Sequence, residues 1–315
     1  MTPTRAIPEC PAQKCEPLAR ELGGRVSGET RVRCHEPLAK RTTLRVGGPA
    51  DVYVEPASEA DLATVLKFCA ERALKFFVLG RGSNLLVRDG GFRGVVVCLA
   101  HSHFGRIDVA EDRVHCGAGA RLKQVAVEAR RHGLSGVEFL EGIPGSVGGA
   151  LRMNAGAMGM ATFDAVATIR VMAFHGRIEE FAAGAVKVEY RDCALLKNHI
   201  ALAAVFKCRA APPEEIAKRM DAFSHKRWES QPAAPSAGCI FKNPAAIPAG
   251  KLVDELGLKG TRVGGAMVSR EHGNFIVNDG TATARDVLEL IESVKLRAKA
   301  ARGIELDTEV EIVGE

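Results

Sequence analysis

The sequence has few aromatic residues and no long apolar run. Two Tyr and one Trp stand among 315 residues, too few for the base-stacking platforms that bind single-stranded nucleic acid. No apolar stretch approaches about 18 residues, and the N-terminus lacks an apolar signal-peptide core, so we expect no membrane span and no secretory leader. The net charge is only +5, without a long basic run. We therefore expect an anionic small-molecule substrate and no nucleic-acid partner.

Cysteine is present but follows no pattern. The nine Cys include no Cys-x-x-Cys pair, and several lie in apolar runs, among them Cys69, Cys98 and Cys208. This usage is typical of a reducing compartment and argues against a disulfide framework. Because no Cys or His pair has ligand spacing, we expect no metal site. We predict a cytoplasmic protein and expect a monomer, although the sequence does not fix the oligomeric state.

Strands and helices mix without a regular β-α-β order, which favours the α+β class. Hydrophobic periodicity predicts strands at 51–56, 76–79, 85–87, 95–99, 166–173, 177–181, 200–208 and 308–313, and helices at 121–132, 214–228 and 251–256. Two further helices are expected after the capping pairs Ser58-x-x-Asp61 and Thr283-x-x-Asp286. Residues 1–34, rich in Pro, Arg and Glu, are expected to be loosely ordered, with no evident role for Cys10, Cys15 and Cys34.

The segment Leu79-Gly-Arg-Gly-Ser-Asn-Leu-Leu86 follows an apolar strand. Gly80 and Gly82 permit positive φ, so successive amide groups can converge on an anion. A dinucleotide fingerprint of the Rossmann type needs a third glycine and then a helix, whereas the sixth position here is Leu85 and a strand follows. That kind of site is disfavoured. The alternative, a plain hairpin turn, stays open from these residues alone.

A second glycine-rich segment, Glu141-Gly-Ile-Pro-Gly-Ser-Val-Gly-Gly-Ala150, is stiffened by Pro144. It lacks the Gly-Lys-Ser/Thr ending of a P-loop. Backbone donors alone could hold a diphosphate there. The segment Asn154-Ala-Gly156 adds a side-chain amide and a glycine at which the backbone can come close to a ligand. A structural role is the alternative. Two such loops in one chain favour a dinucleotide over a mononucleotide.

The segment Ser236-Ala-Gly-Cys-Ile-Phe-Lys-Asn-Pro244 presents one acidic side chain, Cys239, just before a Lys-Asn-Pro turn. A thiol with a pKa of about 8.5 mostly keeps its proton near neutrality. It can therefore serve as a proton donor as well as a nucleophile. The alternative is a small buried hydrophobic residue.

These segments resemble the UDP-N-acetylenolpyruvoylglucosamine reductase family, a group of bacterial wall-synthesis flavoenzymes. The matching motifs follow one another from about residue 38 to the C-terminus and are specific when taken together. Besides the two glycine segments, Asn154-Ala-Gly156 and the Cys239 segment, they are Thr43-Leu-Arg-Val-Gly-Gly48, Tyr190-Arg-Asp192, Gly257-Leu-Lys-Gly260 and Leu306-Asp-Thr-Glu-Val310.

The resemblance implies an FAD-binding domain of the vanillyl-alcohol-oxidase type, made of two α+β lobes, and a smaller C-terminal α+β domain for the substrate. We predict an N-terminal extension over 1–37, the FAD domain over 38–212 with lobes at about 38–101 and 102–212, and the substrate domain over 213–315. Pro212-Pro213 marks the expected boundary. The implied reaction uses NADPH and FAD to reduce UDP-N-acetylglucosamine enolpyruvate to UDP-N-acetylmuramate.

The resemblance also implies site residues. Arg191 and Glu309 would handle the negative charge that develops on the substrate carboxylate, and Cys239, where many members carry Ser, would protonate the α carbon. A carboxylate there must be neutral or paired with Arg191. The expected substrate ligands are Tyr190, Lys242 and Asn243. The expected FAD ligands are Gly80, Arg81, Gly82, Ser83, Asn84, Leu85, Gly142, Ile143, Pro144, Gly145, Ser146, Gly148, Gly149, Asn154, Ala155 and Gly156.

Several alternatives remain open at this stage. Arg191 could form a surface pair with Asp192, Glu309 could face solvent on the last strand beside Glu311, and Tyr190 could simply pack. The segment from Tyr190 to Pro213 is too short for the inserted tyrosine loop of longer members, so we expect the shorter form. Another flavin oxidase on the same fold, often with covalent flavin, is the competing enzyme. A non-catalytic nucleotide-binding regulator would keep the loops and lose the three catalytic residues.

Overall fold

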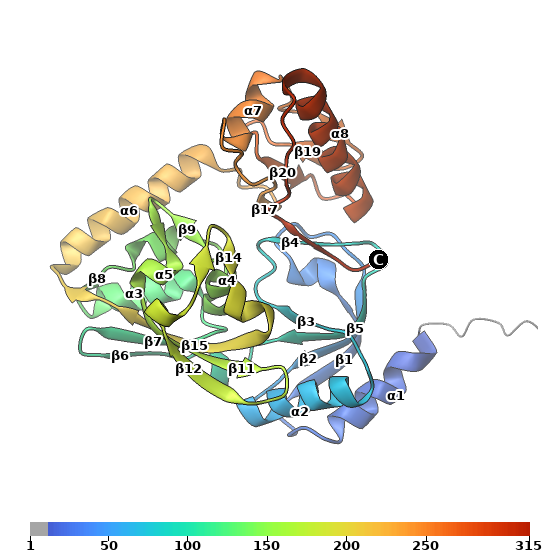
Figure 1. Ribbon diagram of the computed structural model, residues 1–315, viewed down its shortest axis with the longest axis vertical. Helices are drawn as coiled ribbons and strands as arrows, with labels where there is room; N and C mark the ends of the chain where they lie inside the picture. Colours follow the sequence, from blue (N-terminus) through green and yellow to red (C-terminus); the bar gives the residue numbers. More distant parts are fainter. Residues whose placement is uncertain (1–11) are drawn as a thin grey trace, which may run out of the picture.

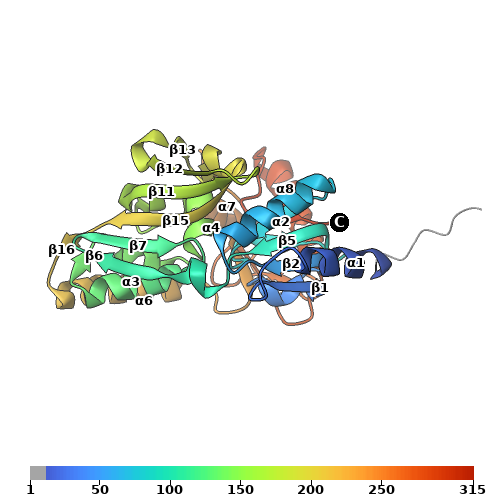
Figure 2. The same ribbon diagram turned by 90° about the horizontal axis from the view of Figure 1, so that it is seen from below.

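The computed structural model describes residues 12–315, so Cys10 lies outside the described part of the chain. It consists of two lobes side by side and a C-terminal domain above them (Figure 1). The first lobe includes the N-terminal helix and strands, the second is built on a larger antiparallel sheet, and α7 and α8 belong to the C-terminal domain. The view from below in Figure 2 shows the same two lobes next to each other.

The first lobe is a mixed four-stranded sheet. Its strands run in the order β1 (Arg31–Pro37), β2 (Pro49–Glu55), β5 (Phe92–Cys98) and β3 (Phe76–Leu79). β1 is antiparallel to β2, whereas β2 and β3 are both parallel to β5. Successive side chains of β2 point to opposite faces: Val52 and Val54 pack with α2 (Glu59–Glu71), while Tyr53 packs in a separate cluster with Leu79 and Val96. Ser58 caps α2 as predicted, accepting from the Asp61 N–H.

The second lobe is built on a five-stranded antiparallel sheet. Its order is β12 (Ile178–Ala182), β11 (Val166–Ala173), β15 (His199–Lys207), β7 (Arg113–Gly117) and β6 (Ile107–Ala110). The helices of this lobe are α3 (Leu122–Arg131), α4 (Val147–Arg152) and α5 (Thr162–Ala165). The small two-residue strands are β8 (Leu134–Ser135), β9 (Gly156–Ala157), β10 (Met160–Ala161), β13 (Val188–Glu189), β14 (Asp192–Cys193) and β16 (Arg209–Ala210). Short 3₁₀ turns are η3 (Glu138–Gly142) and η5 (Ala194–Lys197).

The long helix α6 (Pro213–Ser230) belongs by its packing to the second lobe. Its two buried residues, Ile216 and Met220, join the hydrophobic core that both lobes share, and Arg219 donates to Glu138 at 2.9 Å. We expected this helix to open the substrate domain. It runs over Pro213–Ser230, slightly longer than the expected 214–228. Its amphipathic face covers α3 and η3, so the change of core falls after Ser230.

The C-terminal domain has a hydrophobic core of its own, which also takes in Leu44, Val46 and Leu86 of the first lobe. Its antiparallel sheet runs in the order β17 (Ser236–Cys239), β20 (Phe275–Asn278), β19 (Ala266–Val268) and β18 (Arg262–Val263), with helices α7 (Ala249–Glu255) and α8 (Ala284–Arg302). The predicted cap of α8 is present as a reciprocal Thr283–Asp286 pair. This domain is red and orange in Figure 1.

The last strand differs from the sequence prediction. β21 (Glu311–Val313) is shorter than the expected 308–313, and it pairs in parallel with β4 (Leu85–Val87) of the first lobe. Thr308 instead pairs with Phe241 inside the C-terminal domain. The chain therefore changes pairing partner between these residues, and Glu309 lies at the crossover.

The N-terminal segment is also more ordered than expected. Residues Ala12–Gly23 form α1 and β1 adds an edge strand, so residues 12–37 are part of the first lobe. Cys15 and Leu22 belong to the core shared by the two lobes, and burial of these side chains fixes α1 on the sheet. Within residues 12–315, no helix has the length and apolar character needed to cross a membrane.

Candidate active site

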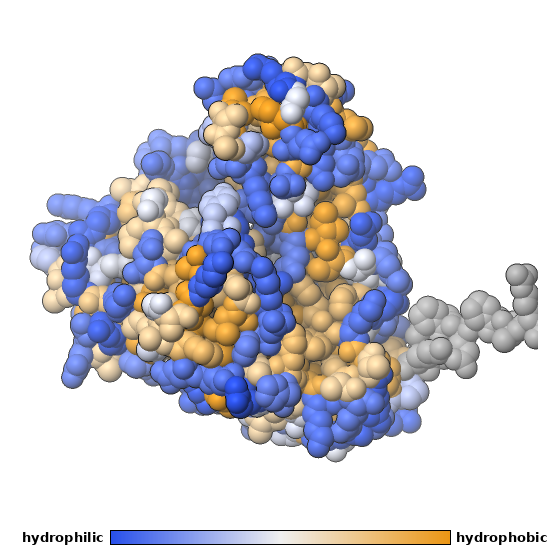
Figure 3. Space-filling view, viewed as in Figure 1, coloured by the Kyte–Doolittle hydropathy of each residue, from blue (hydrophilic) through white to orange (hydrophobic). Residues whose placement is uncertain are grey.

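A cavity of about 1590 Å³ lies between the two lobes and the C-terminal domain. Its walls come from the loop after β3, the β7–α3 loop, the start of α4, the end of α6 and β17. Hydrophobic surface gathers between the lobes beneath the C-terminal domain (Figure 3). The size exceeds that of ordinary ligand pockets, which are about 300–1,000 Å³, and suits a dinucleotide together with a second ligand.

The two glycine-rich loops meet at this cavity. A Cβ added to Gly80 would lie 3.1 Å from the Ser146 Oγ, so the two loops approach each other closely at this point. The Ser83 hydroxyl donates to the Pro144 carbonyl at 2.8 Å, and the Gly148 N–H donates to the Ala118 carbonyl at 2.8 Å. The loops are therefore bound to each other and to the β7–α3 loop.

The cavity walls fit a diphosphate. Within residues 12–315, the N–H groups of Arg81, Ser83 and Ser146 donate to no protein acceptor, although all three residues line the cavity. No Asp or Glu of the described chain lines it, whereas nine cations do: Lys40, Arg41, Arg45, Lys75, Arg81, Arg121, Arg152, Lys197 and Arg227. Three of these cations pair with acids outside the lining, Arg41 with Glu36, Arg152 with Glu311 and Lys197 with Asp192. Free backbone donors and cations without an acidic partner are the groups that hold phosphate oxygens. The residues present thus fit FAD.

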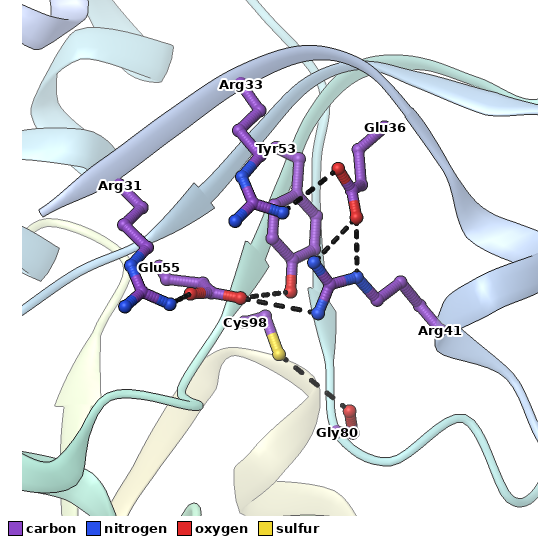
Figure 4. Close-up of polar contacts among 8 residues, drawn as sticks. All are labelled: Arg31, Arg33, Glu36, Arg41, Tyr53, Glu55, Gly80 and Cys98. Atoms are coloured by element: carbon purple, nitrogen blue, oxygen red, sulfur yellow. Dashed lines mark hydrogen bonds and ion pairs between the residues drawn. The ribbon is translucent and has the colours of Figure 1, made fainter.

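One of these cations, Arg41, is held from behind (Figure 4). Its guanidinium lies 4.7 Å from the centre of the Tyr53 ring and donates to Glu36 at 2.7 Å. Glu55 accepts from the Tyr53 hydroxyl at 3.0 Å and lies 3.5 Å from the Arg41 Nη1. Burial raises the pKa of Tyr53 above its usual range, so the phenol stays neutral. The carboxylates fix Arg41 without lining the cavity themselves.

Arg191 and Glu309, far apart in sequence, form an ion pair of 2.7 Å between Nε and Oε1. Arg191 sits at the tip of the β13–β14 hairpin with a φ of +59°. That left-handed conformation is unfavourable for a bulky residue and is concentrated at functional sites. Asp192 pairs with Lys197 at 2.8 Å, so it does not neutralise Arg191. Glu309 is itself held by the backbone, because its N–H donates to Ile240 and its carbonyl accepts from the Asn84 amide.

Cys239 lies next to this pair. Burial raises the pKa of its thiol to about 11; the Glu309 carboxylate also raises it, and Arg191 opposes the rise. The thiol is therefore protonated at neutral pH. Gly238, with a φ of +74°, brings β17 against the first glycine loop and lines the cavity beside Cys239. Tyr190 completes the group: its hydroxyl lies 3.5 Å from Glu309, and Arg191 lies 5.0 Å from its ring centre.

The structure brings only some of the predicted FAD ligands to the cavity. Those that line it are Gly80, Arg81, Ser83, Pro144, Ser146, Gly148 and Gly149; those that do not are Gly82, Asn84, Leu85, Gly142, Ile143, Gly145, Asn154, Ala155 and Gly156. Leu85 is buried in β4 and packs in the core. The Asn154 side chain bonds the Phe163 N–H and the Glu189 carbonyl, so it supports the β13–β14 region.

The predicted substrate ligands Lys242 and Asn243 are exposed and do not line the cavity. The Asn243 side-chain oxygen accepts from the Ala249 N–H at 3.0 Å, which stabilises the start of α7. Their role as substrate ligands stays a prediction.

Sequence reasoning missed large parts of the lining. The missed segments are the loop 40–45, the β7–α3 loop 118–121, residues 196–201 and the stretch 227–236. The run of small residues Gly117-Ala-Gly-Ala120, just before the predicted helix at 121–132, could have indicated the second segment. A Cβ on Gly119 would lie 2.0 Å from the Leu99 carbonyl oxygen, so this backbone needs a glycine. No comparable signal marks residues 196–201.

Comparison with known proteins agrees with this arrangement. Residues 50–182 match the family described as "FAD binding domain", and residues 231–313 match "UDP-N-acetylenolpyruvoylglucosamine reductase, C-terminal domain". The curated UDP-N-acetylenolpyruvoylglucosamine reductase of Geobacter metallireducens is 43% identical over 302 residues, covering 94% of this chain and 99% of that protein. That of Syntrophus aciditrophicus is 42% identical, covering 95% of this chain and 96% of its own length.

Among solved structures, the UDP-N-acetylenolpyruvylglucosamine reductase (MurB) from Thermus caldophilus is similar throughout. It has a TM-score of 0.80 and 40% sequence identity, and the match covers 90% of this chain and all of that one. These matches confirm the predicted fold class, an FAD-binding domain of the vanillyl-alcohol-oxidase type followed by a smaller domain. The chain belongs to the UDP-N-acetylenolpyruvoylglucosamine reductase family.

Proposed function

We propose that this protein is the NADPH-dependent UDP-N-acetylmuramate dehydrogenase of bacterial wall synthesis, reducing UDP-N-acetylglucosamine enolpyruvate with FAD as its cofactor. One observation carries the proposal: a paired Arg191 and Glu309 lie beside a protonated Cys239, at the edge of an acid-free cavity that fits a dinucleotide. Bound FAD would supply hydride-transfer chemistry between NADPH and the enolpyruvyl double bond.

Arg191 is the group we assign to the substrate carboxylate. Its Nε bonds Glu309, while Nη1 and Nη2 make no hydrogen bond with a described residue. The free edge of the guanidinium can therefore hold a carboxylate in a fork of two hydrogen bonds. Negative charge that develops on this carboxylate when the terminal alkene carbon gains hydride would be stabilised by a cation already in position.

Glu309 needs an explanation, because a bare carboxylate would repel that developing charge. The ion pair with Arg191 compensates it, and the backbone bonds at Ile240 and Asn84 hold it in place. We assign to Glu309 the orientation of Arg191 and the support of a neutral Cys239 thiol, since its charge raises the pKa of that thiol.

Cys239 is the group we assign to protonate the α carbon. A thiol whose pKa is about 11 keeps its proton through the neutral range, which suits a general acid and not a nucleophile. The proton on Sγ would pass to the α carbon, completing addition of H₂ across the double bond. A serine at this position could donate the proton from its hydroxyl group.

The substrate's diphosphate or sugar is assigned to Tyr190, Lys242 and Asn243. Tyr190 is 59% exposed beside Glu309, so it is open to a ligand. After Tyr190 the chain turns directly through β14 and η5 into β15. This compact connection supports the shorter form of the family, in which closure over the substrate cannot depend on an inserted loop.

The test is purification followed by an absorbance scan, and then NADPH oxidation with the enolpyruvyl substrate. We expect a yellow protein whose flavin is released by acid as FAD, NADPH oxidation that needs the substrate, and UDP-N-acetylmuramate as product. A folded protein that is reduced by NADPH but never reoxidised by the enolpyruvyl substrate would contradict the proposal. Flavin that stays with acid-precipitated protein would point to a covalent flavin oxidase.

A further inference from the structure

We infer that Arg81 and Arg121 form an electrostatic clasp across the junction of the two lobes, which closes only when a diphosphate, that of FAD, lies between the two arginines. The inference rests on the proposed function and adds a property to the same cavity: two like charges, one from each lobe, that repel each other in the FAD-free protein. Arg121 belongs to none of the motifs that the sequence singled out.

The backbone brings the two arginines together. Arg81 follows Gly80 in the loop after β3 of the first lobe, whereas Arg121 precedes α3 of the second lobe and pairs with Ser146 in an isolated β-bridge. Ser146 in turn lies against Gly80, since a Cβ there would be 3.1 Å from the Ser146 Oγ. Both arginines line the cavity, and the positive charge of Arg121 helps to lower the pKa of Arg81, after the larger effect of burial.

Within residues 12–315 neither Arg81 nor Arg121 forms an ion pair with an acid, and no Asp or Glu of that range lines the cavity. This differs from the other side of the junction between the lobes, where Arg170 of β11 forms an ion pair with Glu59 of α2. Opposite charges therefore close the junction there and like charges meet at the cavity. The asymmetry indicates that an anionic ligand supplies the missing charge.

Two buried hydroxyl groups point to the same ligand. Ser146 is 4% exposed and Thr42 is 7% exposed, and both line the cavity. Within residues 12–315 the buried Thr42 Oγ1 has no hydrogen-bond partner, and the Ser146 Oγ makes no hydrogen bond with a described residue. A buried hydroxyl is normally satisfied, so the Thr42 hydroxyl, with the Ser146 hydroxyl and the free N–H groups of Arg81, Ser83 and Ser146, forms a donor set without an acceptor. A diphosphate ester provides the oxygens.

The clasp predicts two effects of opposite sign from one substitution. Arg121→Gln removes a ligand of the diphosphate, so the Kd for FAD should rise about tenfold or more, as for a lost charge-assisted hydrogen bond. The same change removes repulsion from the FAD-free chain, so its Tm should rise by about 1–3 °C. Arg81→Gln should behave alike. A merely structural arginine would lower the Tm when replaced.

The experiment uses the full chain stripped of FAD, with thermal melts at low and high NaCl and FAD titrations followed by flavin fluorescence. High salt should raise the Tm of the wild type more than that of Arg121→Gln, because screening weakens only a repulsion that is present. Inorganic pyrophosphate should raise the wild-type Tm and do less for the variant. ADP, the part of FAD that carries the diphosphate, should compete with FAD, whereas UDP competing in its place would assign the clasp to the UDP-sugar and overturn the inference.

Two variants control the result. Arg131→Gln changes the same charge at the exposed end of the same helix, where Arg131 pairs with Glu128, and should change neither FAD affinity nor its salt dependence. Arg121→Lys keeps the charge, so the Tm of its FAD-free form should match the wild type. If Arg121→Gln binds FAD as tightly as Arg131→Gln does, or lowers the Tm of the FAD-free chain, the clasp is wrong, while a yellow, NADPH-oxidising enzyme would leave the proposed function standing.

Discussion

The FAD cavity and the proposed reaction centre lie close together but differ in how their charges are balanced. Nine cations and no described carboxylate line the cavity, and six of these cations have no acidic partner within residues 12–315, so their charge is left for a ligand to balance. At the proposed reaction centre, Arg191 and Glu309 balance each other at 2.7 Å. The first arrangement suits a ligand that arrives with fixed charges. The second suits a reaction in which charge appears only briefly, because a paired arginine is held in place before that charge forms.

The difference also concerns backbone and side chain. The cavity binds its ligand through glycine loops and free N–H groups. Substitution of these glycines is tolerated only where an added Cβ has room. The proposed reaction centre would use three side chains from three separate segments, Arg191, Cys239 and Glu309. Damage to the cavity should therefore abolish FAD binding, whereas damage to the reaction centre should leave a yellow enzyme that fails in one half-reaction.

The largest effect is expected for Gly80→Asp. The added Cβ meets only the Ser146 Oγ, at 3.1 Å, so the fold should survive, but a carboxylate would face the diphosphate in a cavity without other acids. We expect FAD affinity to fall by about a hundredfold or more. Flavin fluorescence titration measures it, and Gly80→Ala, which adds the Cβ without the charge, should retain FAD. Equal affinity of the Asp and Ala variants would contradict an anion site at this loop.

Next comes Cys239→Ala, which removes the proposed acid. NADPH should still bleach the flavin at the normal rate, because that half-reaction needs no proton from Sγ, whereas product formation should slow by about a hundredfold or more. Stopped-flow and single-turnover assays separate the two. Cys239→Ser is the matched control and should keep substantial activity. Product formation by the Ala variant at the wild-type rate would remove Cys239 from the mechanism.

A smaller loss is expected for Arg191→Lys, which keeps the charge but loses the planar fork and the bond from Nε to Glu309. Flavin reoxidation by the substrate should slow by about tenfold or more, with FAD affinity unchanged. Lys187→Arg, at a residue whose Nζ pairs with exposed Glu189 at 3.2 Å, is a control that should change nothing. Normal reoxidation in Arg191→Lys would show that the fork geometry is not used.

The smallest effect concerns the pKa of Cys239. Because a raised pKa favours the protonated thiol, its thiolate, the form that iodoacetamide alkylates, should appear only as the pH approaches about 11. Peptide mapping by mass spectrometry should show alkylation rising up to that pH. Glu309→Gln removes a charge that raises the pKa, so its profile should move to lower pH, and Arg191→Gln should move it higher. A midpoint near 8.5 in the wild type would contradict a buried, neutral thiol.

Much of the secondary structure was readable from local patterns. The helix caps at Ser58 and Thr283 are present where the sequence places them, because a side chain that accepts from an N–H three residues later is a local interaction. The strands at 76–79, 85–87 and 166–173 agree residue for residue. The bounds of the last strand and the domain against which α6 packs were harder to predict from the sequence. Both depend on which distant segment contacts the element.

By itself, the sequence determined the chemistry that each short segment can offer: bare backbone at the glycine loops, a thiol at Cys239, a cation at Arg191 and a carboxylate at Glu309. Only the tertiary structure decided which of these meet. It paired Arg191 with Glu309 across 118 residues, raised the pKa of Cys239 by burying it beside them, and placed Arg81 and Arg121 in one acid-free cavity. Charge compensation and burial act over a few ångströms in space, and sequence spacing does not report that distance.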